Sequence, residues 1–129
     1  MTYNNGGIWH RNAQYFEATG FDTSGGHPAP GGAYHYHINM SRAYTANSSQ
    51  HSPIVGYMFD GYPVYGSYAY SSVSGTGGIR RMKTGYRKRN ITARTTLPDG
   101  TVLNASQYGP AINSTYPLGC FYEDYELYV

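Results

Sequence analysis

Glycine and proline interrupt this chain at short intervals, and that spacing limits it to short structural elements. Of its 129 residues, 17 are glycine and 7 are proline. Both types are unfavourable inside helices, because glycine loses much backbone entropy and proline lacks an N–H donor. No apolar run approaches the roughly 18 residues of a membrane-spanning helix, so we expect no membrane insertion. The pattern predicts a single all-β domain, sandwich- or barrel-like, with long loops and little helix.

Tyrosine supplies most of the large side chains. The chain has 16 tyrosines beside 4 phenylalanines and 1 tryptophan, and aliphatic residues are few. Such a composition is typical of disordered chains, but the net charge of +2 is too small for that class. We therefore expect tyrosine rings to replace part of the aliphatic core. The core should be thin, and we expect the domain to gain part of its stability from a neighbour.

Alternating side chains predict a strand in the middle of the first third of the chain. Tyr34, Tyr36 and Ile38 face one side, whereas His35 and His37 face the other. A period of two with aromatic and β-branched residues is typical of strands. The prediction therefore places two imidazoles on one face.

Two further segments carry hairpin signals. The apolar run 53–59 is followed by Asp60-Gly61 and by a second run at 62–65. A two-residue Asp-Gly link between such runs is a strong hairpin signal. The segment 95–104 is a further hairpin candidate, with its turn at Pro98-Asp99-Gly100.

The remaining segments favour irregular structure. We expect 25–32 to be irregular because its prolines cannot continue a ladder, and 71–78 to be a flexible loop. The one helix candidate, 10–18, is short.

Histidines gather between positions 27 and 51 and predict a metal site. His35 and His37 lie about 7 Å apart at their Cα atoms on one face of the predicted strand, so both rings can reach one ion. Imidazole binds zinc, copper, iron and nickel, and His27, His51 or Asp60 would complete the ligand set. The alternative is a polar network in which the histidines bond to tyrosines and backbone carbonyls.

Two long motifs are specific enough to indicate a family. The stretches GFDTSGGHPAPGGAYHYH at 20–37 and HSPIVGYMFDGYPVYGSY at 51–68 closely resemble the YHYH-domain family, named for residues 34–37. WHRNAQYFEA, MKTGYRKR and EDYELYV also look like family segments. The resemblance covers most of the chain. It implies a single secreted or surface-exposed β-rich domain over 1–129, with suspected metal binding through the histidines.

The chain departs from the family pattern in two places. Family members commonly continue beyond the EDYELYV-like segment into a stretch rich in Cys, Asn, Gly, Tyr and His, so we expect this chain to lack the family's C-terminal segment. They also often have a cysteine where this sequence has Thr23-Ser24. Cys120 is the single cysteine and forms no internal disulfide.

Glycosylation sequons point to an extracellular or cell-surface location. The Asn-x-Ser/Thr pattern occurs more often than chance predicts. We expect these asparagines to lie on exposed loops and to be candidates for N-linked glycans. Alternatively, the sequons are a consequence of a composition rich in Ser, Thr and Asn and carry no modification. The five asparagines are Asn39, Asn47, Asn90, Asn104 and Asn113.

Charge is clumped along the chain. Seven basic residues lie within 80–94, and three of the acids are Glu123, Asp124 and Glu126. The basic cluster is either a solvated face, a binding site for phosphate or an acidic glycan, or a docking site for the acidic tail. The small net charge gives no reason to expect nucleic acid as a partner.

The first functional hypothesis is a non-catalytic structural subunit of a self-associating extracellular assembly, a fibre or surface layer. Tyrosine-rich, weakly charged surfaces favour contact, and open strand edges accept a neighbouring strand. The tail 115–129 would dock on the next copy and build a homo-oligomer or filament. Its candidate contact residues are Tyr116, Tyr122, Tyr125 and Tyr128.

The alternatives use the histidine face. One is a metal-binding module for copper or zinc. The other is a metal-dependent enzyme, with Asp22 or Asp60 as the candidate base. No Ser-His-Asp arrangement is supported by spacing, so the sequence favours a protein that is not an enzyme.

Overall fold

The computed structural model describes residues 7–40 and 42–128. Within it the chain divides into two compact units. The terminal unit comprises the residues up to Glu17 and those from Thr84 onward, and the central unit is Ala18–Lys83. No helix in the described ranges has the length and apolar character needed to cross a membrane.

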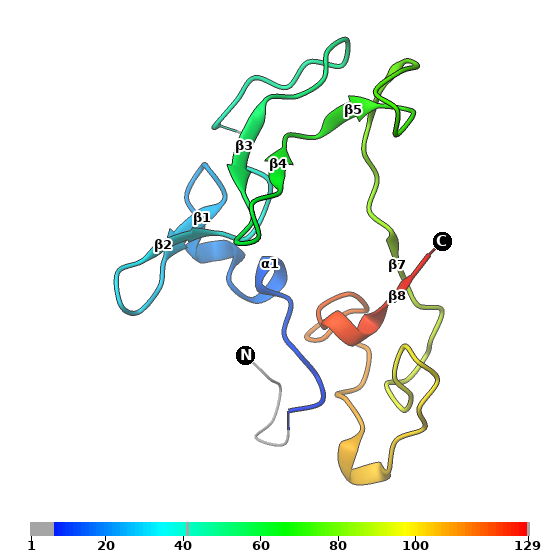
Figure 1. The fold of residues 1–129 in the computed structure, drawn as a ribbon. Helices are drawn as coiled ribbons and strands as arrows, with labels where there is room; N and C mark the ends of the chain where they lie inside the picture. The colour runs from blue at the N-terminus through cyan, green and yellow to red at the C-terminus, as the bar shows by residue number, and fades with distance from the viewer. Residues whose placement is uncertain (1–6, 41, 129) are drawn as a thin grey trace. The chain divides into compact units, whose positions relative to one another are not determined.

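The described residues form short elements joined by longer connections (Figure 1). The helical elements each have three or four residues: α1 (Ala13–Phe16), η1 (Ala18–Gly20), η2 (Ala105–Gln107) and η3 (Tyr122–Asp124). All four strand pairs are antiparallel. The first three are hairpins: β1 (Gly26–Pro28) with β2 (Tyr34–Tyr36), β3 (Ile54–Tyr57) with β4 (Pro63–Tyr65), and β5 (Tyr68–Tyr70) with β6 (Ile79–Arg81). The last pair, β7 (Tyr86–Lys88) with β8 (Tyr125–Leu127), joins strands that are far apart in the chain.

The all-β prediction is confirmed, since the described residues hold 8 strands and are 11% helical. The strands do not join into the expected sandwich or barrel, because every sheet in the described ranges has two strands. Strands of three or four residues offer few ladder bonds and little apolar face to a third strand. The helix candidate at 10–18 forms only the single turn of α1, which Asn12 caps by accepting a hydrogen bond from the backbone N–H of Gln14.

One turn design recurs five times and explains the glycine spacing. In each case residue i donates its N–H to the carbonyl of residue i+4, and a glycine at i+3 donates back to the carbonyl of residue i. This is a type I turn closed by a left-handed glycine, the usual three-residue hairpin loop. The glycines, with φ between 74° and 88°, are Gly25, Gly32, Gly61, Gly75 and Gly100.

The predicted hairpin at Asp60-Gly61 is confirmed, but its loop is one residue longer than predicted. Met58 donates to Tyr62 and Gly61 donates to Met58, so the loop holds three residues. A two-residue loop of the Asp-Gly type needs positive φ at both positions. Asp60 does not have it, because all described residues with positive φ are glycines. The hairpin predicted at 95–104 also forms, with a single bridge between Thr96 and Val102.

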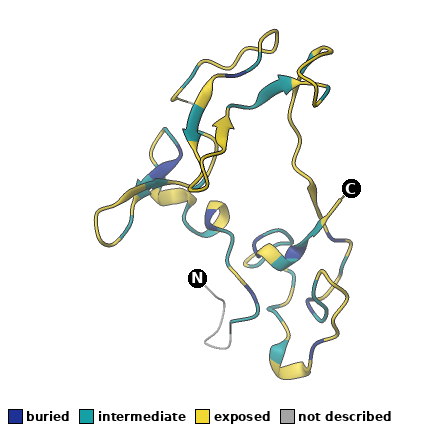
Figure 2. Ribbon diagram, viewed as in Figure 1, coloured by how far each residue is buried: buried dark blue, intermediate teal, exposed yellow. Residues whose placement is uncertain are grey.

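Among the described residues, the hydrophobic core cluster lies in the terminal unit. Figure 2 marks the buried residues of both units in dark blue. Trp9 and Phe121 are fully buried and meet edge to face with ring centroids 6.2 Å apart. Cys120 and Leu103 complete the buried cluster. The Trp9 indole N–H donates to the carbonyl of Gln107, which satisfies its one polar group.

A buried ion pair joins the basic segment to the acidic tail. Arg94 and Asp124 have fully buried side chains and form two bonds of 2.8 Å. Arg94 also donates to three backbone carbonyls, at Pro110, Tyr116 and Pro117. With the β7–β8 pairing, these contacts show that the acidic tail docks on the basic segment within one chain.

The central unit is organised differently. In its described part no large hydrophobic side chain is buried, and the only buried polar side chain is Ser52. Its hairpins expose aromatic rings instead, with Tyr57 69% accessible and Phe59 fully exposed. The thin core expected from the composition is therefore confined to the terminal unit.

Candidate metal centre

The β1–β2 hairpin brings two histidines face to face. His27 on β1 stands directly opposite His35 on β2. Cross-strand partners project from the same face of a sheet, so the two rings lie side by side, with centroids 4.7 Å apart. The prediction that 25–32 is irregular was wrong for Gly26–Pro28, because a two-stranded sheet has only edge strands and an edge tolerates Pro28.

His37 joins the pair from just beyond the end of β2. Two residues separate it from His35, so the pleat puts both on one face, as the alternation predicted. The backbone N–H of His37 donates to the carbonyl of Gly25 and continues the pairing of the hairpin. Its ring centroid lies 4.6 Å from that of His35 and 5.0 Å from that of His27.

The three imidazoles converge closely enough to share an ion. One ring nitrogen from each of His27, His35 and His37 lies within 4.8 Å of the other two. The Nε2 atoms of His27 and His37 are 3.0 Å apart. Two ligands bound at about 2.0–2.1 Å in a tetrahedral site are separated by about 3.3 Å. The pair is thus already near the required spacing, and a ring nitrogen of His35 lies within 4.8 Å of both.

Neighbouring groups fix the orientation of these rings. Phe21 stacks on His37 with an interplanar angle of 10° and meets His27 edge to face. The Nδ1 atom of His35 lies 3.2 Å from the carbonyl oxygen of Ala33. A proton on Nδ1 that is donated to this carbonyl leaves the lone pair on Nε2, which is the arrangement of many metal-binding histidines.

Asp22 anchors the hairpin that carries the histidines. Its carboxylate accepts hydrogen bonds from the Tyr34 hydroxyl at 2.6 Å and from the backbone N–H groups of Ser24 and Gly26. The bond from Tyr34, with the backbone donors, holds the pKa of Asp22 below its ordinary value. The same bond raises the pKa of Tyr34 to about 12.

Gly26 is required where the hairpin packs on itself. A Cβ atom at this position would lie 2.6 Å from the carbonyl oxygen of His35 and 2.9 Å from the Tyr34 hydroxyl. Any side chain would therefore push apart the strands that carry His27 and His35. This explains the glycine directly before His27 in the motif.

The other two candidate ligands lie outside this group. His51 contacts the rings of Tyr65 and Tyr70, and its Nδ1 atom lies 2.8 Å from the carbonyl oxygen of Ser52. Asp60 sits in the β3–β4 turn and accepts a bond from the backbone N–H of Tyr62. Among the described residues, the close group is His27, His35 and His37.

The predicted contact tyrosines of the tail lie in the terminal unit. Tyr116 packs against the hydrophobic core, and Tyr125 is partly buried in β8. Tyr122 and Tyr128 are 57% and 59% exposed. Only these last two present most of their rings to solvent.

Sequence reasoning missed the ring-stacking role of Phe21. It considered Asp22 only as a base, although the spacing Asp22-Thr23-Ser24-Gly25 is typical of a turn in which the aspartate accepts backbone bonds. That signal was sufficient to predict an anchoring role.

The family is established by a match over the full length of the chain. The family model described as YHYH protein covers residues 1–129. The chain therefore belongs to the YHYH family, as its two long motifs predicted. Comparison with curated proteins and with solved structures gave no match.

Proposed function

We propose that this protein is a metal-binding module in which His27, His35 and His37 hold a copper or zinc ion. The observation that carries the proposal is the convergence of three ring nitrogens within 4.8 Å on one hairpin face. Three neutral imidazoles suit both ions and leave a further coordination position for water or an external ligand.

The surroundings of the site support binding rather than catalysis. Asp22, the first candidate base, is held by Tyr34 and two backbone donors, and its lowered pKa makes it a weak proton acceptor. Asp60, the second, is used by its own turn. Both carboxylates thus support the fold of their hairpins.

Metal titration of the purified protein tests the proposal. We expect one copper or zinc ion per chain. Loss of a residue that only hydrogen-bonds to a metal ligand lowers metal affinity about 10–100-fold, so loss of the ligand itself in His35→Ala should lower it at least about 100-fold. His51→Ala and His10→Ala are matched controls, because they remove histidines outside the group and should leave affinity unchanged. Equal metal content in His35→Ala and the wild type would refute the site.

A second candidate function, self-association, is favoured by the exposed rings of the central unit. A groove of about 1100 Å³ in this unit is lined by side chains from β2, β3 and β4 and from the segments beside them, including Tyr34, Tyr57, Phe59 and Tyr65. Monomeric proteins rarely expose apolar patches of this kind, and isolated hairpins are only marginally stable in water. We propose that a second copy of the chain covers this groove, and that the assembly is a filament or surface layer.

Sedimentation velocity over a hundredfold range of concentration tests self-association. We expect oligomers and a melting temperature that rises with concentration. The double variant Tyr57→Ser/Phe59→Ser should shift the protein to monomer. Val73→Ser is a matched control, since Val73 is equally exposed but lies outside the groove. A wild type that stays monomeric at high concentration would exclude this function.

The sequons support an extracellular location and N-linked glycosylation. All five asparagines are exposed. Asn47 and Asn113 accept local backbone bonds through Oδ1, which leaves Nδ2, the atom that carries a glycan, outside those bonds. Asn39 instead donates through Nδ2 to the Tyr44 hydroxyl. The intact mass before and after enzymatic deglycosylation of the native protein tests occupancy, which we expect at Asn47 and Asn113 before Asn39.

A further inference from the structure

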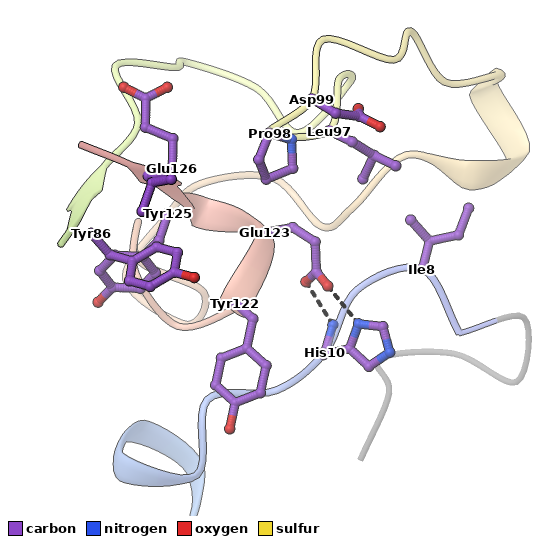
Figure 3. Close-up of a pocket in the computed structure, with 11 residues that line it drawn as sticks. Ile8, His10, Tyr86, Leu97, Pro98, Asp99, Tyr122, Glu123, Tyr125 and Glu126 are labelled. Atoms are coloured by element: carbon purple, nitrogen blue, oxygen red, sulfur yellow. Dashed lines mark hydrogen bonds and ion pairs between the residues drawn. The ribbon is translucent and has the colours of Figure 1, made fainter. Parts of the chain in front are cut away.

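The terminal unit has a hollow that the proposed functions do not use. It is a shallow surface hollow of about 700 Å³, open to solvent, and Tyr86, Tyr122 and Tyr125 are among the residues that line it (Figure 3). A second hollow of about 480 Å³ shares all three tyrosines. Together they form what we call the tyrosine-lined groove. Tyr86 and Tyr122 are 60% and 57% exposed, so their rings present broad faces to a ligand.

A histidine with a fixed orientation lies beside these rings. Figure 3 shows the Glu123 carboxylate bridging the side chain and the backbone of His10. One oxygen lies 2.5 Å from His10 Nδ1, and the other accepts the backbone N–H at 2.8 Å. A nitrogen that faces a carboxylate carries the proton, so in the neutral form of the ring the lone pair lies on Nε2, away from Glu123. The His10 side chain is 49% exposed.

The charges around the groove select the class of ligand. In the described part of the chain, neither hollow is lined by lysine or arginine. The lining carboxylates of Asp99, Glu123 and Glu126 therefore disfavour anions. Glu123 and Glu126 are also poor sites for a cation, because Glu123 is paired with His10 and Glu126 with Arg87. A neutral ligand that donates hydroxyl hydrogens fits this lining best.

We propose that the tyrosine-lined groove binds a neutral carbohydrate. The apolar face of a sugar ring would pack on Tyr122 and Tyr86, and its hydroxyls would donate to His10 Nε2 and to Asp99. Aromatic walls with a few fixed polar groups are the usual composition of small-ligand sites. Glu123 is a positioning residue in this scheme, since it holds the His10 tautomer that accepts a hydroxyl proton.

Calorimetric titration with soluble neutral hexasaccharides of glucose, xylose, mannose and N-acetylglucosamine tests the proposal. The buffer contains a chelator, so that the result does not depend on the histidine metal site. We expect at least one sugar to bind with a Kd below about 1 mM, and Tyr122→Ala and His10→Ala to weaken it at least tenfold. Tyr62→Ala is the matched control, because it removes an exposed ring from the central unit that lines neither this groove nor the groove proposed for self-association.

Three outcomes would overturn the carbohydrate site. They are binding of none of the four sugars, equal binding by wild type and Tyr122→Ala, and saturable binding of tetramethylammonium in preference to every sugar. Trp9 fluorescence checks that Tyr122→Ala and His10→Ala are folded, since the single tryptophan is buried in the core of the same unit.

Discussion

The buried pair of Arg94 and Asp124 makes a stringent test of how the terminal unit is held together. Both side chains are inaccessible to solvent, and Asp124 also accepts backbone hydrogen bonds from Gly119 and Phe121. The substitution Asp124→Asn keeps the size of the side chain and an oxygen acceptor. It removes the negative charge and leaves the Arg94 guanidinium buried without a counterion.

The magnitude follows from that burial. Removing one partner of a buried pair costs about 3–5 kcal/mol, because the remaining charge stays desolvated. The oxygen of the introduced amide still accepts part of the backbone bonding, so we expect a loss near the lower end, about 3 kcal/mol. For a chain of this size that loss lowers the Tm by about 10 °C.

Trp9 fluorescence during thermal and urea unfolding provides the assay. Its indole is buried beside Phe121, so its emission reports on the core of the terminal unit. The matched control is Glu126→Gln, which breaks the ion pair with Arg87 in a setting where these side chains are 31% and 57% exposed. That loss should stay below about 1 kcal/mol and vanish in high salt, whereas the effect of Asp124→Asn persists.

Equal shifts of the unfolding midpoint in the two variants would refute this reasoning. So would a loss in Asp124→Asn that disappears in high salt, because a buried pair is shielded from dissolved ions. Either result would mean that the tail is held by the β7–β8 pairing and the core, and not by the ion pair.

Three further predictions concern single positions. Gly26→Ala should weaken metal binding at least tenfold by displacing the histidine strands, whereas Gly31→Ala, with open space around it, should leave the affinity in a metal titration unchanged. Cys120 should resist alkylation in the native protein at neutral pH, because it is buried and burial raises its pKa, and rapid labelling seen by mass spectrometry would contradict the core packing. The bond from Tyr34 to Asp22 should stabilise the metal-free hairpin fully from about pH 3.8 to pH 10. Folding lowers the pKa of the Asp22 carboxyl, so the stabilisation is lost as the pH falls below this range. Folding raises the pKa of the Tyr34 phenol, so the stabilisation is also lost as the pH rises from 10 to about 12. Amide NMR shifts that stay constant through both limits would contradict the bond.

The sequence by itself determined part of the local structure of the chain, namely two hairpin turns and one alternating strand. Gly61 and Gly100 marked two hairpin turns, because only glycine adopts the left-handed conformation at no cost. The period of two at 34–38 placed His35 and His37 on one face, because a pleated strand leaves no other choice. These features depend on neighbours in the chain, and the structure confirms them.

The tertiary structure decided which distant residues meet. His27 and His51 were equal candidates to join the histidine pair, and the β1–β2 register placed His27 there and left His51 against Tyr65 and Tyr70. The tertiary structure likewise brings Asp124 into contact with Arg94, which lies 30 residues away in the chain. Such pairs depend on strand pairing and burial across long loops, where the free energy of a contact is set by the whole fold and not by the residues that flank it.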